Sequence, residues 1–271
     1  MYAFNFHRPT TLRQAANLLA KNEDAKLLAG GHSLIPVMKL RLASPATLID
    51  LSKIDGLSGV ELKGRSIVIG AMARHKDVAD SPAVRQKMPG LAAVPDSIGD
   101  PHVRNRGTIG GSIANNDPNA DYPAACLGLG ATIITNKRRI PADEFFSGMF
   151  ETVLEPNEII TKVSFPIAKK AAYEKFKHPA SGFALVGVFV SKRGPEIRVA
   201  VTGAGANGVF RATSFEEALK KRFHPKSLEG VSIPPDGMNS DIHAGTEYRA
   251  HLVGVLARRA VAKANAAGSE A

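Results

Sequence analysis

The stretch "LLAGGHSLIPVMKLRL" (residues 27–42) places two adjacent glycines between an apolar run and a basic amphipathic one. A second glycine pair lies in "RNRGTIGGSIANNDPNADYPAA" (residues 104–125). Because glycine has no side chain, the backbone at such a pair can approach a ligand closely and adopt positive φ. Successive N–H groups in that conformation form an anion-binding concavity. The two stretches predict that both loops press their backbones against one anionic dinucleotide.

Polar residues beside these glycines add side-chain donors and acceptors. Ser33 offers a hydroxyl donor in the first loop, and Asp121 offers a carboxylate that suits ribityl or ribose hydroxyls. Alternatives stay open for each loop taken alone. His32 is either a donor to the ligand or a solvated side chain. Residues 115–117 ("NND") either contribute to the ligand site or merely build turns.

Length and composition place the chain among ordinary globular proteins. Its 271 residues suffice for two modest domains, and 44% of them are hydrophobic and 22% charged. No apolar run approaches the roughly 20 residues that a membrane-spanning helix needs. The N-terminus lacks the basic region and apolar core of a secretion signal. We therefore expect a cytoplasmic protein without a membrane span, for which peripheral membrane association stays open.

The single cysteine, Cys126, limits the chemistry further. One thiol cannot form an internal disulfide, and a cysteine-held iron–sulfur cluster needs about four thiolates. The apolar surroundings "YPAACLGLGA" favour a buried structural thiol over a reactive one. The sequence also shows no zinc-type His/Glu spacing, no P-loop and no recognisable Ser-His-Asp arrangement. It therefore predicts no catalytic residue and no metal ligand on this chain.

The net charge of +10 favours an anionic ligand or partner. The basic residues are scattered, tryptophan is absent, and no stacking-aromatic motif of a nucleic-acid module appears. We expect no nucleic-acid partner, although a basic nucleic-acid-binding protein remains the third reading of this sequence.

The pattern of elements predicts an α+β fold. A helix is expected over residues 10–22, capped by Thr10 or Thr11, and helical pieces broken by Pro82 and Pro89 follow between about residues 75 and 95. Short alternating runs such as "EIITKVSFP" (residues 158–166) predict strands. Short strands outnumber helices in the first half of the chain, and sheet precedes helices in the second.

The segment 167–182, "IAKKAAYEKFKHPASG", is polar, basic and turn-rich, and we place a domain boundary in it. This divides the chain into residues 1–174, with parts of about 1–55 and 56–174, and residues 175–271. Beyond the boundary, "FALVGVFVS" is continuously apolar and suits a strand covered on both faces. A later helix is expected to start with a capping box of Thr213 and Glu216.

The segment "GAGANG", Gly203 to Gly208, matches the G-x-G-x-x-G pattern and follows a predicted strand. A dinucleotide fingerprint needs a helix that opens within the motif, but "VFRAT" intervenes before the helix signal at Thr213. A turn with a bulge is the better reading. The alternative, a self-contained NAD-dependent dehydrogenase built on this segment, stays open as the second reading.

Three separated stretches, "LLAGGHSLIPVMKLRL", "GDPHVRNRGTIGGSIANNDPNADYPA" and "YEKFKHPASGFALVGV", together resemble the FAD-binding medium subunit of the molybdenum hydroxylases. That family includes aerobic carbon monoxide dehydrogenase and xanthine dehydrogenase. The resemblance spans nearly the whole chain, and its Gly-Gly-His-Ser form is most similar to the carbon monoxide dehydrogenase branch.

The resemblance implies a two-part FAD-binding domain, of the vanillyl-alcohol oxidase and xanthine dehydrogenase type, followed by a C-terminal sheet-and-helix domain. FAD would lie extended with its diphosphate against both glycine loops. Ile98 would contact the isoalloxazine, and Lys177 would lie near the flavin. The implied FAD-binding residues are Leu27, Leu28, Ala29, Gly30, Gly31, His32, Ser33, Leu34, Ile98, Thr108, Ile109, Gly110, Gly111, Ser112, Asp121, Ile160 and Lys177.

The resemblance also implies partners. A large subunit would carry the molybdenum cofactor, and a small subunit would carry two [2Fe–2S] clusters that pass electrons to this flavin, in a dimer of heterotrimers. The flavin would then reduce a quinone, NAD or another acceptor. This sequence does not reveal the oxidised substrate, because the oxidation site would lie on another chain, and it does not reveal which acceptor the flavin reduces.

Overall fold

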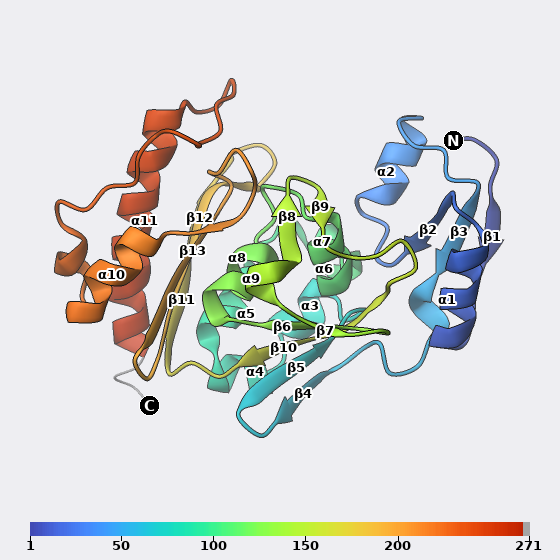
Figure 1. Cartoon of the computed structure of the whole chain (residues 1–271), viewed down its shortest axis with the longest axis horizontal. Coiled ribbons are helices and arrows are strands. Elements are labelled where there is room, and N and C mark those ends of the chain that lie inside the picture. Colours follow the sequence, from blue (N-terminus) through green and yellow to red (C-terminus); the bar gives the residue numbers. More distant parts are fainter. Residues whose placement is uncertain (268–271) are drawn as a thin grey trace.

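The computed structural model describes residues 1–267 and arranges them as three successive parts, each built on its own sheet (Figure 1). In the N-terminal part, a parallel three-stranded sheet of order β1-β3-β2 packs against helix α1. The Thr11 hydroxyl caps α1 by accepting the N–H of Gln14 at 3.2 Å, as predicted. The elements are β1 (Asn5–His7), α1 (Leu12–Lys21), β2 (Ala25–Leu28), α2 (Leu34–Lys39), β3 (Thr47–Asp50) and the 3₁₀ turn η1 (Leu51–Lys53).

The central part is built on an antiparallel five-stranded sheet of order β4-β5-β10-β6-β7. Pro82 and Pro89 divide the helical stretch after β5, as predicted, because each is the first residue of a helix, where its missing N–H costs no hydrogen bond. The elements are β4 (Val60–Lys63), β5 (Ser66–Gly70), α3 (His75–Ala79), α4 (Pro82–Lys87), α5 (Pro89–Asp96), α6 (Pro101–Arg106), α7 (Ile109–Asn115), α8 (Tyr122–Leu129), β6 (Thr132–Thr135), β7 (Arg139–Pro141), α9 (Ala142–Phe145), β8 (Phe146–Gly148), β9 (Glu151–Thr152) and β10 (Ile160–Pro166).

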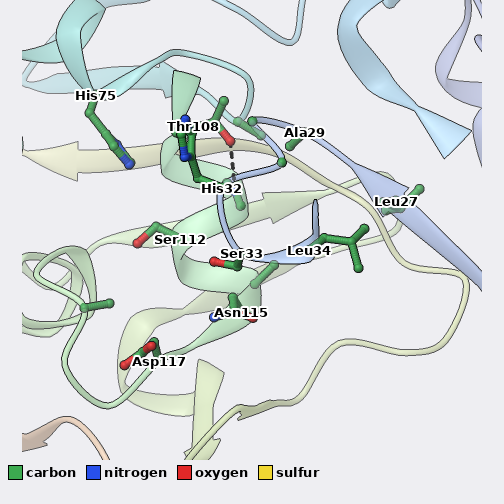
Figure 2. A pocket seen from close by; sticks show the side chains of 18 of the residues that line it. Leu27, Ala29, His32, Ser33, Leu34, His75, Thr108, Ser112, Asn115 and Asp117 are labelled. Carbon is green, nitrogen blue, oxygen red and sulfur yellow. Dashed lines mark hydrogen bonds between the residues drawn. The ribbon is translucent and has the colours of Figure 1, made fainter. Parts of the chain in front are cut away.

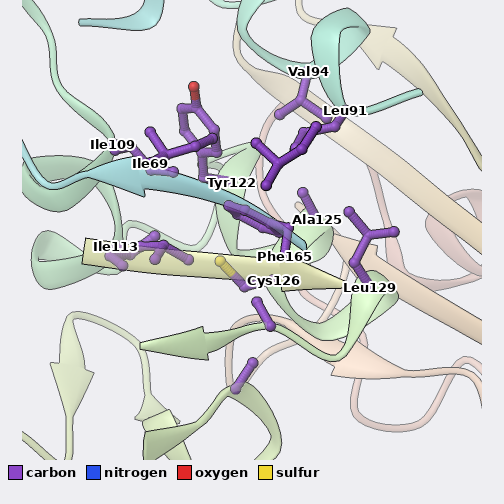
Figure 3. Packing of buried hydrophobic residues seen from close by; sticks show 14 of the residues in the cluster. Ile69, Leu91, Val94, Ile109, Ile113, Tyr122, Ala125, Cys126, Leu129 and Phe165 are labelled. Carbon is purple, nitrogen blue, oxygen red and sulfur yellow. The ribbon is translucent and has the colours of Figure 1, made fainter. Parts of the chain in front are cut away.

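The main hydrophobic core lies between this sheet and helices α5, α7 and α8 (Figure 3). Ile69 and Phe165 enter it from the sheet, and Leu91 from α5. Cys126, on α8, is fully buried among them, and burial raises the pKa of its thiol above the usual range. The prediction of a buried structural cysteine is confirmed.

The C-terminal part carries an antiparallel four-stranded sheet of order β11-β12-β13-β14. One face of this sheet contacts α10 and α11, and the other contacts α5 and α8 of the central part (Figure 1). The elements are β11 (Lys170–Lys177), β12 (Ala184–Arg193), β13 (Glu196–Thr202), β14 (Phe210–Arg211), α10 (Thr213–Lys221), the 3₁₀ turn η2 (Pro225–Leu228) and α11 (Thr246–Ala267).

Strand β12 is covered on both faces, as its unbroken apolar run predicts. Phe189 points into the central core, whereas Val186, Val188 and Val190 point into the core formed with α10 and α11. All four side chains are fully buried. The sheet is therefore shared between two hydrophobic cores.

Strand β11 corrects the sequence analysis of residues 167–182. The polar segment taken for a turn-rich boundary contains an eight-residue strand that pairs with β12 along its length. Its polar side chains have specific partners: Lys170 donates to Asn265 at 2.7 Å, and Glu174 pairs with Lys263 at 2.8 Å. A boundary after residue 174 would therefore cut a paired strand.

The start of α10 also differs from expectation. Ala212 precedes the helix, and the Thr213–Glu216 capping box is not formed. The Glu216 carboxylate instead accepts the N–H of Val199 at 2.9 Å and pairs with Arg211 at 2.6 Å. A buried carboxylate with a charged partner and a strand N–H is better compensated there than at a helix end.

The glycine segment 203–208 forms the turn that follows β13, and the next helix begins only at Thr213. Gly203 has a positive φ of 79°, and its carbonyl accepts a hydrogen bond from Arg249 at 2.7 Å. No helix N-terminus therefore opens within this segment, in agreement with the predicted turn.

Arg249 is a fully buried cation on α11. Its guanidinium donates to the carbonyls of Leu185 and Gly203, both at 2.7 Å, and to the Asp241 carboxylate at 2.7 Å. Its exposed fraction is 1%, and its removal would take this donor from both carbonyls, whereas Asp241 would keep the backbone N–H groups of His243 and Ala244.

We expect Arg249→Met to lower the free energy of unfolding by about 3 kcal/mol, because it removes the guanidinium donor from the carbonyls of Leu185 and Gly203 and the charged partner of Asp241. Arg259→Met on the exposed face of the same helix is the matched control and should change stability by less than about 0.5 kcal/mol. Urea unfolding of both variants measures this. Equal stabilities would contradict a structural role for Arg249.

Candidate functional site

The two glycine segments lie against each other, so their distant positions in the sequence converge in space (Figure 2). A Cβ atom on Gly30 would sit 2.2 Å from the carbonyl oxygen of Arg106 and 2.8 Å from the Cα of Gly107. A Cβ on Gly110 would sit 2.7 Å from the carbonyl oxygen of Ala71. Both glycines are therefore required by backbone-to-backbone contacts.

The sequence predicts a loop with positive φ at the second glycine pair, and the structure shows a helix there instead. Gly110 and Gly111 form the first turn of α7, whose N-cap is Thr108. The backbone N–H groups there are already used: Gly110 donates to Ala71 at 2.8 Å, and Gly111 donates to the Thr108 hydroxyl at 3.2 Å. The helix forms although glycine is a poor helix former, because the cap and the contact with Ala71 stabilise it.

The first glycine segment has the opposite character. Gly31 has a positive φ of 75°, as predicted, and turns the chain from β2 toward α2. Within residues 1–267, the backbone N–H groups of residues 30–33 have no protein acceptor. This segment therefore supplies the free backbone donors of the site, whereas the second segment supplies mainly its rigid wall.

A cavity of about 730 Å³ opens where the two segments meet. Its size lies within the range typical of small-molecule sites, about 300 to 1,000 Å³. Most of the predicted site residues line it, some of them visible in Figure 2: Leu27, Leu28, Ala29, Gly30, Gly31, His32, Ser33, Leu34, Ile98, Thr108, Gly110, Gly111, Ser112, Asp121 and Ile160.

Two predicted residues do not line the cavity. Ile109 is fully buried in the central core, where its side chain packs within the hydrophobic cluster. Lys177 is exposed at the end of β11, and its contact with the flavin stays a prediction.

Residues 115–117 divide between the two roles considered for them. Asn115 and Asp117 line the cavity. Asn116 is structural, because its side-chain amide donates to the carbonyls of Gly148 at 2.7 Å and Glu151 at 2.8 Å and so holds the β8–β9 hairpin.

Asp121 is held in the cavity wall by two residues of β11. Its carboxylate accepts the hydroxyl of Tyr173 at 2.5 Å and pairs with Lys175 at 2.9 Å. Lys175 also donates to the carbonyl of Ser97 at 3.1 Å. Burial raises the pKa of the Asp121 carboxyl, and Lys175 and Tyr173 oppose that shift. The predicted acidic contact is therefore a fixed, paired carboxylate with lone pairs left for a ligand hydroxyl.

His75 is a buried ionisable residue of the cavity lining, as are Asp121 and Glu158. The exposed fraction of His75 is 5%, and Figure 2 shows the imidazole pointing into the cavity, toward His32 and Ser112. Burial, with a smaller contribution from His32, lowers the pKa of His75 to about 4. The imidazole is therefore neutral at physiological pH.

Sequence reasoning missed His75, Lys175 and Phe150. Phe150 lines the cavity from the tip of the β8–β9 hairpin, where its backbone has a positive φ of 58°. Lys175 lies two residues before Lys177, but a register shift after Phe176 breaks the alternation of the strand, so the position of Lys177 did not point to it. No sequence signal distinguished His75 or Phe150 from surface residues.

The donor set fits a dinucleotide diphosphate. Residues 30–33, whose N–H groups have no acceptor among the described residues, line the cavity together with the hydroxyl-bearing Ser33, Thr108 and Ser112. Gly30 and Gly110 stand where a Cβ would clash with the facing backbone. Apolar residues such as Leu27 line the remainder. Among residues 1–267, no group of three His, Cys, Asp or Glu side chains is arranged to hold a metal ion.

None of the helices among the described residues has the length and apolar character that crossing a membrane requires.

Comparison with known proteins identifies relatives of the whole chain. Residues 2–168 match the family described as the FAD binding domain in molybdopterin dehydrogenase. The chain is 36% identical to the carbon monoxide dehydrogenase medium chain of Hydrogenophaga pseudoflava, over 95% of this chain and 96% of that one. It is 35% identical to the nicotine 6-hydroxylase medium subunit of Paenarthrobacter nicotinovorans, over 97% and 98% of the two chains.

A solved structure agrees with these relatives. Carbon monoxide dehydrogenase from Hydrogenophaga pseudoflava, in a form that lacks the Mo-pyranopterin moiety of the molybdenum cofactor, contains a chain that superposes with a TM-score of 0.87. The sequence identity is 36%, and the match covers 98% of each chain, so it includes the C-terminal sheet and helices.

We expect Gly30→Ala to cost about 1 to 3 kcal/mol of stability and to weaken FAD binding, because the added methyl group forces the two segments apart. Gly245→Ala is the control, since a Cβ there meets open space at an ordinary φ. Urea unfolding and quenching of flavin fluorescence measure the two effects. A Gly30→Ala protein indistinguishable from Gly245→Ala would show that the contact is dispensable.

A second prediction concerns acid stability in protein stripped of flavin. Because the folded-state pKa of His75 is about 4 and an unfolded histidine titrates near 6.5, the unfolded chain alone takes up this proton between those values. Stability is lost as the pH falls through this window. Between pH 7 and 4.5 the wild type should lose about 2 kcal/mol more than His75→Gln. Parallel pH profiles in urea unfolding would contradict a neutral buried imidazole.

Proposed function

Because the chain belongs to the family of FAD-binding domains of molybdopterin dehydrogenases, we propose that it carries electrons through FAD between the clusters of a partner subunit and an external acceptor. The family and α+β fold predicted from the sequence are confirmed. The chain is thus an oxidoreductase subunit with FAD as its cofactor.

The observation that carries the proposal is the cavity between the two glycine segments. Its free N–H groups at residues 30–33 and its hydroxyls suit the FAD diphosphate, and Asp121 suits ribityl or ribose hydroxyls. Ile98, in the cavity wall, would contact the isoalloxazine. When bound, FAD supplies the redox chemistry, and the protein supplies binding, orientation and electrostatics.

Electrons would reach this chain from a partner. Its only cysteine, Cys126, is fully buried in the central core, so a cysteine-held cluster must belong to another chain. The relatives' names, "medium chain" and "medium subunit", support a multi-subunit complex. We propose a large molybdenum-cofactor subunit and a small [2Fe–2S] subunit as partners, in a dimer of heterotrimers, with a quinone, NAD or another acceptor receiving the electrons.

The substrate would be set by the partner that holds the molybdenum cofactor. Two relatives of nearly equal identity are named for carbon monoxide and for nicotine, so a medium subunit of this type serves chemically different oxidations. We propose a complex with the subunit organisation of carbon monoxide dehydrogenase, whose substrate is determined by the molybdenum subunit. A cytoplasmic location stays a prediction.

We also propose a domain division that respects the sheets. The FAD-binding part would extend from the N-terminus through β10, and the C-terminal part would start with β11 at Lys170 rather than after residue 174. Pairing of β11 with β12 over its whole length supports this division.

The full chain should copurify with, or take up, one equivalent of FAD, and released flavin should be FAD rather than FMN. An absorption spectrum of the purified protein, followed by chromatography of the released flavin, measures this. When the flavin is reduced under anaerobic conditions, mixing with a quinone, NAD⁺ or oxygen should reoxidise it in at least one case. Colourless protein that binds NAD instead would overturn the proposal.

A further inference from the structure

One wall of the cavity contains hydrogen-bond donors and no carboxylate. The side chains of His75 and His32 lie near each other on this wall, close to Thr108 and Ser112. Asp117 lies at the opposite end of the cavity (Figure 2). His75 comes from α3, a helix that contributes to neither glycine segment. Three separate parts of the chain therefore converge on this wall.

Burial of the His75 imidazole leaves one of its polar atoms unpaired. The Nδ1 atom of His75 has no hydrogen-bond partner among the described residues, nor has the hydroxyl of Tyr122, whose ring centroid lies 5.4 Å from that of the imidazole. The Nε2–Cδ2 edge of the imidazole packs against Gly107, where a Cβ would lie 2.5 Å from Nε2. Leaving a buried polar atom unpaired costs about 1 to 3 kcal/mol, so such atoms in native proteins call for an explanation. A phenyl or aliphatic group would fill the same volume without this cost.

We infer that the His75 imidazole is a further ligand-binding group of this site, which hydrogen-bonds the diphosphate of the bound dinucleotide opposite the free N–H groups of residues 30–33. The inference rests on the proposed FAD function and adds a residue from α3 to it. A diphosphate is the part of FAD with the most acceptor oxygens and no donors, so it matches a wall composed of donors. The low pKa of His75 keeps the imidazole neutral in the ligand-free protein, which avoids a buried unpaired charge.

The test compares His75→Phe, His75→Asn and His75→Gln in the full chain. Flavin-fluorescence titration gives the dissociation constant for FAD, and displacement of FAD by ADP gives that for a ligand with the diphosphate but no flavin. We expect His75→Phe to weaken both ligands by a similar factor of about 10 to 100. The absorption spectrum of the bound flavin should not change. One amide variant should recover most of the loss, Asn if Nδ1 makes the contact and Gln if Nε2 does.

His102→Phe is the matched control, because this imidazole lies on neighbouring α6, is 91% exposed and does not line the cavity. The dissociation constants of the His102→Phe variant for FAD and for ADP should equal those of the wild type. Unchanged ADP affinity in His75→Phe, or a weakening accompanied by an altered flavin spectrum, would overturn the inference, since the first shows no contact and the second a general distortion. Wild-type protein that binds neither FAD nor ADP would instead refute the proposed function.

Discussion

The structure depends on the contact between two backbone segments that are far apart in the sequence. Gly30 meets the carbonyl of Arg106 so closely that a single methyl group has no room. This contact joins the N-terminal sheet to the helices of the central part and creates the cavity at their junction. Glycine has two roles here. It allows the two backbone segments to come into contact, and in the first segment the backbone N–H groups remain free for a ligand.

The C-terminal sheet is tied to the same cavity through buried polar contacts. Tyr173 and Lys175 reach from β11 to the carboxylate of Asp121. A buried ion pair of this kind adds little to stability on balance, because the desolvation of both charges offsets their attraction. Its value lies in orientation, since the carboxylate has one position and one set of remaining lone pairs to offer.

Much of the fold and site could be predicted from the sequence, and the failures have physical reasons. Apolar patterning and proline positions located strands such as β10 and β12 and the helix starts at Pro82 and Pro89, because these signals are local. Strand β11 was missed because its lysines and glutamate find partners on α11 and at Asp121, which composition does not reveal. The helix α7 was missed because its stability comes from Ala71 and a threonine cap rather than from glycine. His75 was missed because only tertiary structure buries it.

The matched FAD-binding family ends at residue 168, but the cavity does not. Ser181, Gly182 and Phe183 line it from beyond that point, and Lys175 fixes Asp121 from the following strand. The cavity proposed for the cofactor is therefore not formed by residues 2–168 alone. A chimaera that joins the first 168 residues of this chain to the remainder of a relative would combine two sets of cavity-lining residues that do not belong to the same protein. Substitutions in one half of the cavity therefore constrain those in the other half.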